Sequence, residues 1–196
     1  EIKNAILLLL LLSVFTGLYL VIIGGWIILV IGLSSFLFAY LYTATKFSIA
    51  YNGLGEVFVF LYFGLIAAIG TAYLQTHSYL FDSLVIGCIF GFLNMSLLII
   101  NNLRDVNEDR KNNKKTLIVF FGKKFGFLEL FIALTVPIVI YLSFIDDFVY
   151  SSISLLMFAL YILISCYKSK KFIINSALPI SSLYIAFFTI ILMYNL

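Results

Sequence analysis

The stretch NNLRDVNEDRK, residues 101–111, is a dense cluster of charge in a chain that carries little charge elsewhere. Of the 196 residues, 64% are hydrophobic and only 11% are charged. Soluble domains usually contain about 25% charged residues. The composition therefore predicts an all-α membrane protein in which this polar stretch lies at the membrane surface.

Seven apolar segments flank the polar cluster and are long enough for membrane-spanning helices, which need about 20 residues each. Gly24-Gly25 separates the first two segments, since glycine adopts turn conformations readily, and Asp146-Asp147 separates the fifth from the sixth. We expect one membrane-embedded domain over residues 1–196. The segments are residues 5–23, 26–42, 56–74, 80–100, 125–145, 149–167 and 172–196.

The basic residues give this helical bundle an orientation. With seven spans, the N-terminus and the loops 43–55, 101–124 and 168–171 share one side of the membrane. All 12 Lys and Arg residues fall on that side. Because basic loops stay in the cytoplasm, we expect a multi-pass protein of the inner (cytoplasmic) membrane. Its polar loops would be cytoplasmic and its C-terminus outside.

The polar cluster contains a candidate metal site. Asp105 and Asp109 are four residues apart, which on a helix places their Cβ atoms roughly 5–6 Å apart on one face. Extending the same register backwards adds Asn101. Two carboxylates and an amide suit Mg²⁺ shared with a substrate phosphate. The alternative is a solvated loop whose basic excess only fixes the topology.

Three lysines follow the acidic pair, namely Lys111, Lys114 and Lys115. Their charges could neutralise a diphosphate. They could equally attract anionic lipid headgroups at the cytoplasmic surface, and the sequence leaves both interpretations open.

A second group of polar residues lies on the same side of the membrane, in residues 42–56. Tyr42, Lys46 and Asn52 precede a predicted helix that starts at Glu56. A glutamate at a helix N-terminus is either a partner of the helix dipole or a carboxylate that faces substrate or metal.

Asn94 is a polar residue inside the fourth predicted span. It precedes Asn101 by seven residues, so both side chains face the same way on a helix. Asn94 either makes a buried hydrogen bond between helices or lines a cavity.

Two segments resemble the UbiA superfamily of intramembrane aromatic prenyltransferases. Residues 101–117, NNLRDVNEDRKNNKKTL, are similar to the second aspartate-rich motif of that family. Residues 42–76 contain a Tyr-x-x-x-Lys element at Tyr42 and Lys46. The run YNGLGE at residues 51–56 and the spelling NNLRD look like the branch that prenylates 1,4-dihydroxy-2-naphthoate.

The resemblance implies a UbiA-type bundle of transmembrane helices, of which seven of nine spans are present. Members of the family carry two aspartate-rich motifs, the first between their second and third helices. This sequence would then be N-terminally truncated, without the first two helices and the first motif. The likeness covers residues 1 to about 125, and the last three spans match in hydropathy alone.

The activity that the resemblance implies is Mg²⁺-dependent transfer of a polyprenyl group from its diphosphate to 1,4-dihydroxy-2-naphthoate, which gives demethylmenaquinone in menaquinone biosynthesis. Asp105 and Asp109 would hold the metal. Lys46 would contact the diphosphate, and Tyr42 would bind it or face the allylic cation. The isoprenoid tail would lie between helices. Further substrate-binding residues would be Asn101, Arg104, Lys115, Glu56 and Asn52, with Phe60 and Phe63 as walls for the tail.

Other functions stay open at this point. The acceptor could be 4-hydroxybenzoate or homogentisate, with the same chemistry. A non-enzymatic membrane transporter would need ionisable groups near the middle of the bilayer, whereas most of the charge here lies at one surface. Nothing in the sequence points to a nucleic-acid partner, and it does not indicate an oligomeric state.

Overall fold

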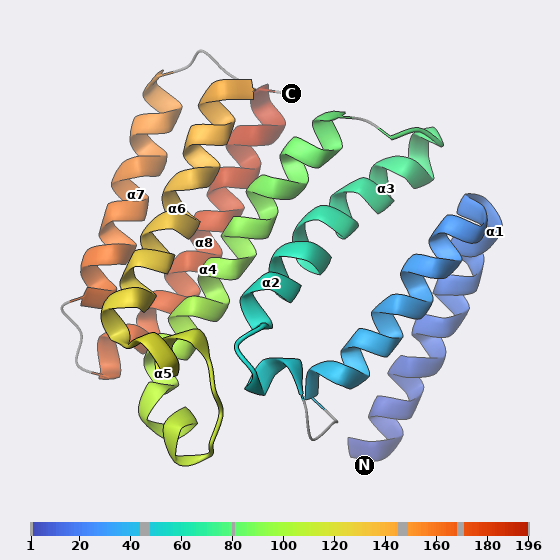
Figure 1. Cartoon of the computed structure of the whole chain (residues 1–196). Helices are drawn as coiled ribbons and strands as arrows, with labels where there is room; N and C mark the ends of the chain where they lie inside the picture. Colours follow the sequence, from blue (N-terminus) through green and yellow to red (C-terminus); the bar gives the residue numbers. More distant parts are fainter. Residues whose placement is uncertain (1, 44–47, 80, 145–148, 168–170, 196) are drawn as a thin grey trace.

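The computed structural model describes residues 2–43, 48–79, 81–144, 149–167 and 171–195. All regular secondary structure in these ranges is helical (Figure 1), which confirms the predicted fold class.

The first element, α1 (Ile2–Thr43), is a hairpin of two helical arms. The arms meet at Gly25, whose φ of 65° and ψ of −153° interrupt the helix, a conformation that glycine adopts without a steric penalty. The two arms run side by side in opposite directions (Figure 1). The two spans predicted at residues 5–23 and 26–42 are therefore confirmed.

We expect Gly25→Ala to destabilise this hairpin by about 1–2 kcal/mol, because a Cβ at positive φ meets the neighbouring backbone. Gly17→Ala in the first arm is the matched control, since a Cβ at Gly17 meets nothing within 4 Å. Thermal unfolding in detergent checks the prediction. Equal melting temperatures for the two variants would contradict it.

The next span combines three helical pieces after a short 3₁₀ turn, η1 (Ile49–Tyr51). A helix and a π-helical turn lead into a second helix. This second helix is followed by its C-cap residue His77, which has a left-handed φ of 51°. The pieces are α2 (Gly55–Phe60), η2 (Leu61–Ile66) and α3 (Ala67–Thr76).

The fourth span, α4 (Phe81–Lys111), is longer than predicted. We expected it to end near residue 100, but the helix continues through the whole charged cluster. The remaining part of the predicted loop holds the short helix α5 (Leu117–Phe121), which begins where the Thr116 side chain accepts a hydrogen bond from Val119 N at 3.3 Å. Three long helices complete the chain, α6 (Lys123–Phe144), α7 (Val149–Tyr167) and α8 (Lys171–Asn195).

Five helices in the described part of the chain are long and apolar enough to cross a membrane, and Ser151–Tyr167 is a shorter apolar helix. The first of the five has 40 residues and is the hairpin of α1, so it accounts for two crossings. Seven crossings result, and the two chain ends lie at opposite ends of the bundle (Figure 1). The five are Lys3–Tyr42, Gly55–Thr76, Phe81–Lys111, Lys123–Phe144 and Ala177–Tyr194.

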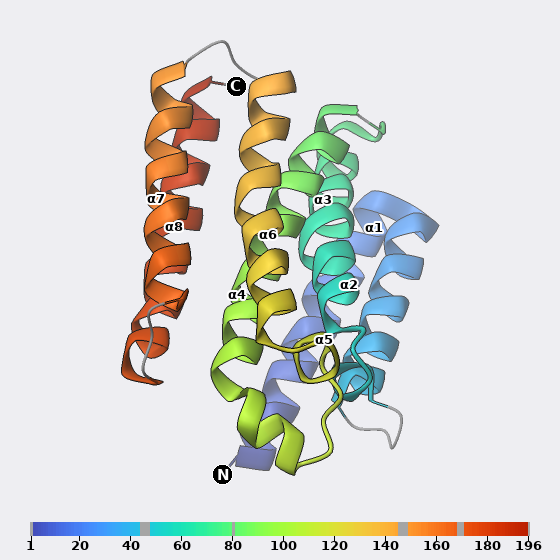
Figure 2. The ribbon, with the colours of Figure 1, turned by 60° about the vertical axis from the view of Figure 1, so that its left-hand side comes forward.

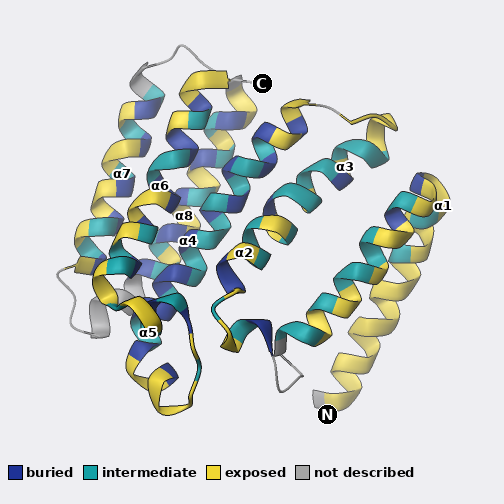
Figure 3. Cartoon of the chain, viewed as in Figure 1, coloured by how far each residue is buried: buried dark blue, intermediate teal, exposed yellow. Residues whose placement is uncertain are grey.

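The central helix of the bundle is α4, which packs against α6 and α8 on one side and against α2, η2 and α3 on the other (Figure 2). The buried core joins α4, α6, α7 and α8 and includes Leu93, Leu134 and Phe188, none of which has exposed surface. The hairpin α1 is mostly exposed (Figure 3). This arrangement places the charged end of α4 near α5 and the beginning of α2 (Figure 1).

Candidate functional site

The polar end of α4 carries a network centred on Arg104. Its Nε donates to Asp105 Oδ1 at 2.8 Å and its Nη2 donates to Asp105 Oδ2 at 2.7 Å. The same Nη2 donates a short hydrogen bond to Asn101 Oδ1. A guanidinium that binds both oxygens of one carboxylate fixes that carboxylate in position. Arg104 therefore orders Asn101 and Asp105 together, one turn apart on the helix.

Asp109 has a different partner and is more buried, with 8% of its surface exposed. Lys114 Nζ lies 3.1 and 3.2 Å from its two carboxylate oxygens. The chain brings the lysine back by a turn in which Asn113 takes a φ of 55° and Lys114 N donates to Asp109 O at 2.9 Å. Each motif aspartate is thus paired with its own cation.

The helix pitch explains why these two aspartates differ in burial. Each step of four residues advances about 40° around an α-helix beyond a full turn. Asp109 is therefore rotated by about 80° from Asn101, close to the direction of Asn102 at about 100°. Asp105 therefore shares a face of the helix with each of the other two residues, whereas Asn101 and Asp109 lie at the two edges of that face.

Asn102 is a residue that sequence reasoning missed. Its Nδ2 donates to Glu56 Oε1 at 2.8 Å, and the two residues are 2% and 3% exposed. The pair joins the start of α2 to the charged end of α4. A signal was present in the sequence, because Asn102 falls in helical register with the buried residues Ile99 and Val106, and a polar residue on such a face needs a partner.

A backbone contact joins the turn that precedes α2 to the loop that follows α4. Lys115 N donates to Tyr51 O at 2.9 Å. Gly53 has a φ of 71°, and a Cβ there would lie 3.1 Å from Lys115 O. Lys115 thus contributes its backbone to this junction, while the residue as a whole is exposed.

The other predicted site residues are placed less uniformly. Lys46 lies outside the described residues. Asn52 is exposed, and its Nδ2 donates to Ser48 O at 2.9 Å, within its own turn. The structure therefore does not bring Asn52 to the acidic residues. Tyr42 lies close to Glu56, because a Cβ at Gly55, the residue before Glu56, would lie 3.3 Å from Tyr42 Oη.

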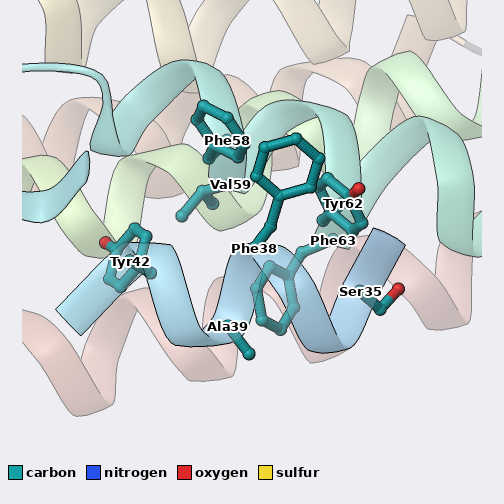
Figure 4. A pocket seen from close by; sticks show the side chains of 8 residues that line it. All are labelled: Ser35, Phe38, Ala39, Tyr42, Phe58, Val59, Tyr62 and Phe63. Carbon is teal, nitrogen blue, oxygen red and sulfur yellow. The ribbon is translucent and has the colours of Figure 1, made fainter. Parts of the chain in front are cut away.

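An aromatic cavity of about 640 Å³ begins at Tyr42 and lies between the second arm of α1 and the span α2–η2 (Figure 4). The Phe38 ring lies 4.9 Å from Phe58 and 5.5 Å from Tyr62, measured between ring centroids. The cavity is lined by Ser35, Phe38, Ala39, Tyr42, Phe58, Val59, Tyr62 and Phe63.

Only one of the two predicted walls faces this cavity. Phe63 lines it, whereas Phe60 packs on the opposite side of α2, with its ring 5.0 Å from that of Phe92 and against the bare backbone of Gly91. Phe60 does not line this cavity because it stands on the side of α2 that packs against α4.

The two aspartates would need further ligands from a substrate and from water to hold a magnesium ion. No group of three or more His, Cys, Asp or Glu side chains suited to a metal occurs among the described residues. Mg²⁺ is often held by one or two carboxylates together with substrate phosphates and water. Asp105 and Asp109 would be two such carboxylates, each now paired with a cation, Arg104 or Lys114.

Comparisons with known proteins identify relatives of the chain. The chain is 37% identical over 110 residues to 1,4-dihydroxy-2-naphthoate octaprenyltransferase of Mycobacterium leprae, an alignment that covers 56% of this chain and 37% of the relative. It is 34% identical over 129 residues to the octaprenyltransferase of the same name from Escherichia coli, which covers 63% and 42% of the two chains. No solved structure was found to match.

A third relative is the 2-carboxy-1,4-naphthoquinone phytyltransferase of Synechocystis sp., 31% identical over 102 residues, or 52% of this chain and 33% of the relative. The chain thus spans well under half the length of each of these relatives. A family comparison covers nearly all of it, from residue 2 to residue 188. The chain belongs to the UbiA prenyltransferase family.

Proposed function

We propose that this protein transfers a polyprenyl group from polyprenyl diphosphate to 1,4-dihydroxy-2-naphthoate, with demethylmenaquinone as the product in menaquinone biosynthesis. One observation carries the proposal. The acidic end of α4 and the aromatic cavity adjoin through Tyr42, Glu56 and Asn102, so a charged headgroup and an apolar tail find matching surfaces in one site. The names of the relatives support the choice of acceptor.

In this proposal Asp105 and Asp109 would hold Mg²⁺ when the diphosphate donor is bound. The bound ion would neutralise the charge that grows on the leaving diphosphate. Arg104 keeps Asp105 oriented, and Asn101 supplies an amide oxygen beside it. Lys114 is close enough to exchange its contact with Asp109 for one with a diphosphate oxygen.

Tyr42, Glu56 and Lys115 form the proposed opposite side of the headgroup site, and Lys46 is added to it from its place in the Tyr-x-x-x-Lys element alone. The side chain of Tyr42 lies at one end of the cavity (Figure 4), where its hydroxyl could donate to a diphosphate oxygen or face the allylic carbon. The charges of Lys46 and Lys115 would add to the positive field around the leaving group. Glu56 is held by Asn102 and points a carboxylate toward the same region.

The aromatic cavity is the proposed place of the isoprenoid chain. Its rings offer apolar contact along the chain, and their faces stabilise positive charge on the allylic carbon by cation–π attraction. Exclusion of water by the surrounding helices protects the cation from hydrolysis. We place the protein in the inner membrane with this headgroup site at the cytoplasmic surface, in accord with the positions of its basic residues.

An acceptor competition assay tests the proposal. The protein expressed from its complete reading frame is supplied in membranes with Mg²⁺, a polyprenyl diphosphate and equal amounts of 1,4-dihydroxy-2-naphthoate, 4-hydroxybenzoate and homogentisate. We expect prenylated naphthoquinone to dominate the products. Preferential prenylation of either benzenoid acceptor would replace the naphthoate assignment, and absence of any prenylated product would refute the proposed activity.

A further inference from the structure

The span α2–η2–α3 contains a π turn, Leu61–Ile66, in the middle of an otherwise regular helix. A π turn interrupts the regular hydrogen-bond ladder and is often found at functional sites. A side chain from α4 donates a hydrogen bond to the backbone of this turn. Asn94 Nδ2, on α4, donates to Phe63 O at 3.0 Å.

The face of α4 that carries Asn94 is pressed against the π turn. A Cβ added to Gly64 would lie 2.4 Å from Gly91 Cα and 2.6 Å from Gly87 O. Gly87, Gly91 and Asn94 follow one another at spacings of four and three residues, so they form one stripe along α4. The two glycines let the backbones touch, and the Asn94 amide adds a hydrogen bond one turn further on.

The opposite side of the π turn forms the wall of the aromatic cavity. Tyr62 and Phe63 belong to the turn, whereas Phe58 and Val59 belong to the preceding helix. The rings of Phe58 and Tyr62 stack across this junction, with centroids 6.2 Å apart and planes inclined by 7°. The relative direction of these rings therefore depends on the shape of the turn.

We infer that Asn94 is a positioning residue for the isoprenoid chain of the donor: from behind the cavity wall, it holds the π turn in the shape that directs Tyr62 and Phe63 toward the chain. The inference rests on the proposed function, because it takes the aromatic cavity as the donor's binding site. Asn94 itself does not line the cavity.

The effect of Asn94 on donor binding should depend on the length of the isoprenoid chain. Tyr42 lies at one end of the cavity, and Tyr62 and Ser35 lie toward the other (Figure 4). With its headgroup near Tyr42, a short isoprenoid chain contacts the nearer rings, whereas a long chain reaches past the π turn. Loss of the Asn94 hydrogen bond should therefore weaken long donors more than short ones.

Steady-state kinetics of Asn94→Leu with dimethylallyl diphosphate, which has a single isoprene unit, and with a long polyprenyl diphosphate tests the inference in the protein expressed from its complete reading frame. Leucine has nearly the same size but cannot donate a hydrogen bond. We expect the KM for the long donor to rise about fivefold to tenfold. The kcat, the KM for dimethylallyl diphosphate and the KM for the acceptor should each stay within about twofold of wild type.

Thr135→Val on α6 is the matched control. It removes a hydroxyl that donates to Phe131 O at 2.7 Å in another span, and neither residue lines the cavity. Its kinetics should match wild type with both donors. Asn94→Ala repeats the test with less apolar bulk if the leucine variant does not accumulate in the membrane.

Two outcomes would overturn the inference. Unchanged KM values for both donors would mean that the hydrogen bond does not shape the cavity. An equal loss for short and long donors would mean that Asn94 matters only for general stability. A wild-type protein that transfers no isoprenoid would instead refute the proposed function, and with it the donor site on which the inference rests.

Discussion

Asp105→Asn and Asp109→Asn should each lower kcat for prenyl transfer by at least about a hundredfold, the usual cost of removing one charge-stabilising group from an active site. Asparagine keeps the size of the side chain and loses the negative charge that a magnesium ion requires. Each aspartate is also paired with a separate cation, Arg104 or Lys114. Each substitution therefore also removes the ion pair that this cation makes with the aspartate, and we expect either variant alone to lose activity.

Asp82→Asn is the matched control for both variants. Asp82 lies in the first turn of the same helix, at the opposite end of the bundle, and is exposed. Prenyl transfer in membranes is measured over a range of Mg²⁺ concentrations, with immunoblots to show equal insertion. Turnover near the wild-type rate in either motif variant would remove that aspartate from the proposed metal site, whatever the control does.

Gly64→Ala should destabilise the bundle by about 3 kcal/mol, at the upper end of the usual cost of overpacking. The new Cβ would lie 2.4 Å from Gly91 Cα and 2.6 Å from Gly91 N. Both contacts are with backbone, so no side-chain rotation can relieve them. The span α2–η2–α3 and α4 would have to separate, which also opens the contact behind the cavity wall.

Gly32→Ala controls for the change in helix propensity, because a Cβ at Gly32 meets nothing within 4 Å. Thermal unfolding of both purified variants in the same detergent measures the difference. We expect the melting temperature of Gly64→Ala to be clearly lower than that of wild type, and the melting temperature of Gly32→Ala to be unchanged. A melting temperature of Gly64→Ala equal to that of wild type would show that the two backbones are not in contact there.

The positions of the spans could be predicted because a long apolar run can be recognised without knowing which helices pack against it. Their ends were harder to predict. The helix α4 continues to Lys111, since Arg104 and Lys114 pair with the aspartates and make a charged helical end favourable at the membrane surface. Hydropathy alone ends the span at residue 100, where the apolar run stops.

The acidic residues of the candidate site could be proposed from the sequence. The residues that support them could not. The spacing of Asp105 and Asp109 pointed to a metal site from local geometry. The Glu56–Asn102 hydrogen bond joins residues 46 positions apart, and the Asn94 bond joins residues 31 positions apart. Such partners are chosen by tertiary packing, which a single sequence does not display. Gly64, within the π turn, likewise lies against Gly87 and Gly91 of α4.

The most direct test is an experimental structure of the protein, expressed from its complete reading frame, with Mg²⁺ and a non-hydrolysable polyprenyl diphosphate analogue. We predict a magnesium ion within about 2.0–2.1 Å of oxygens from both Asp105 and Asp109, bridging them to the diphosphate, with the isoprenoid chain beside Phe58 and Tyr62. A bound analogue with no ion between its diphosphate and these two aspartates would contradict the account.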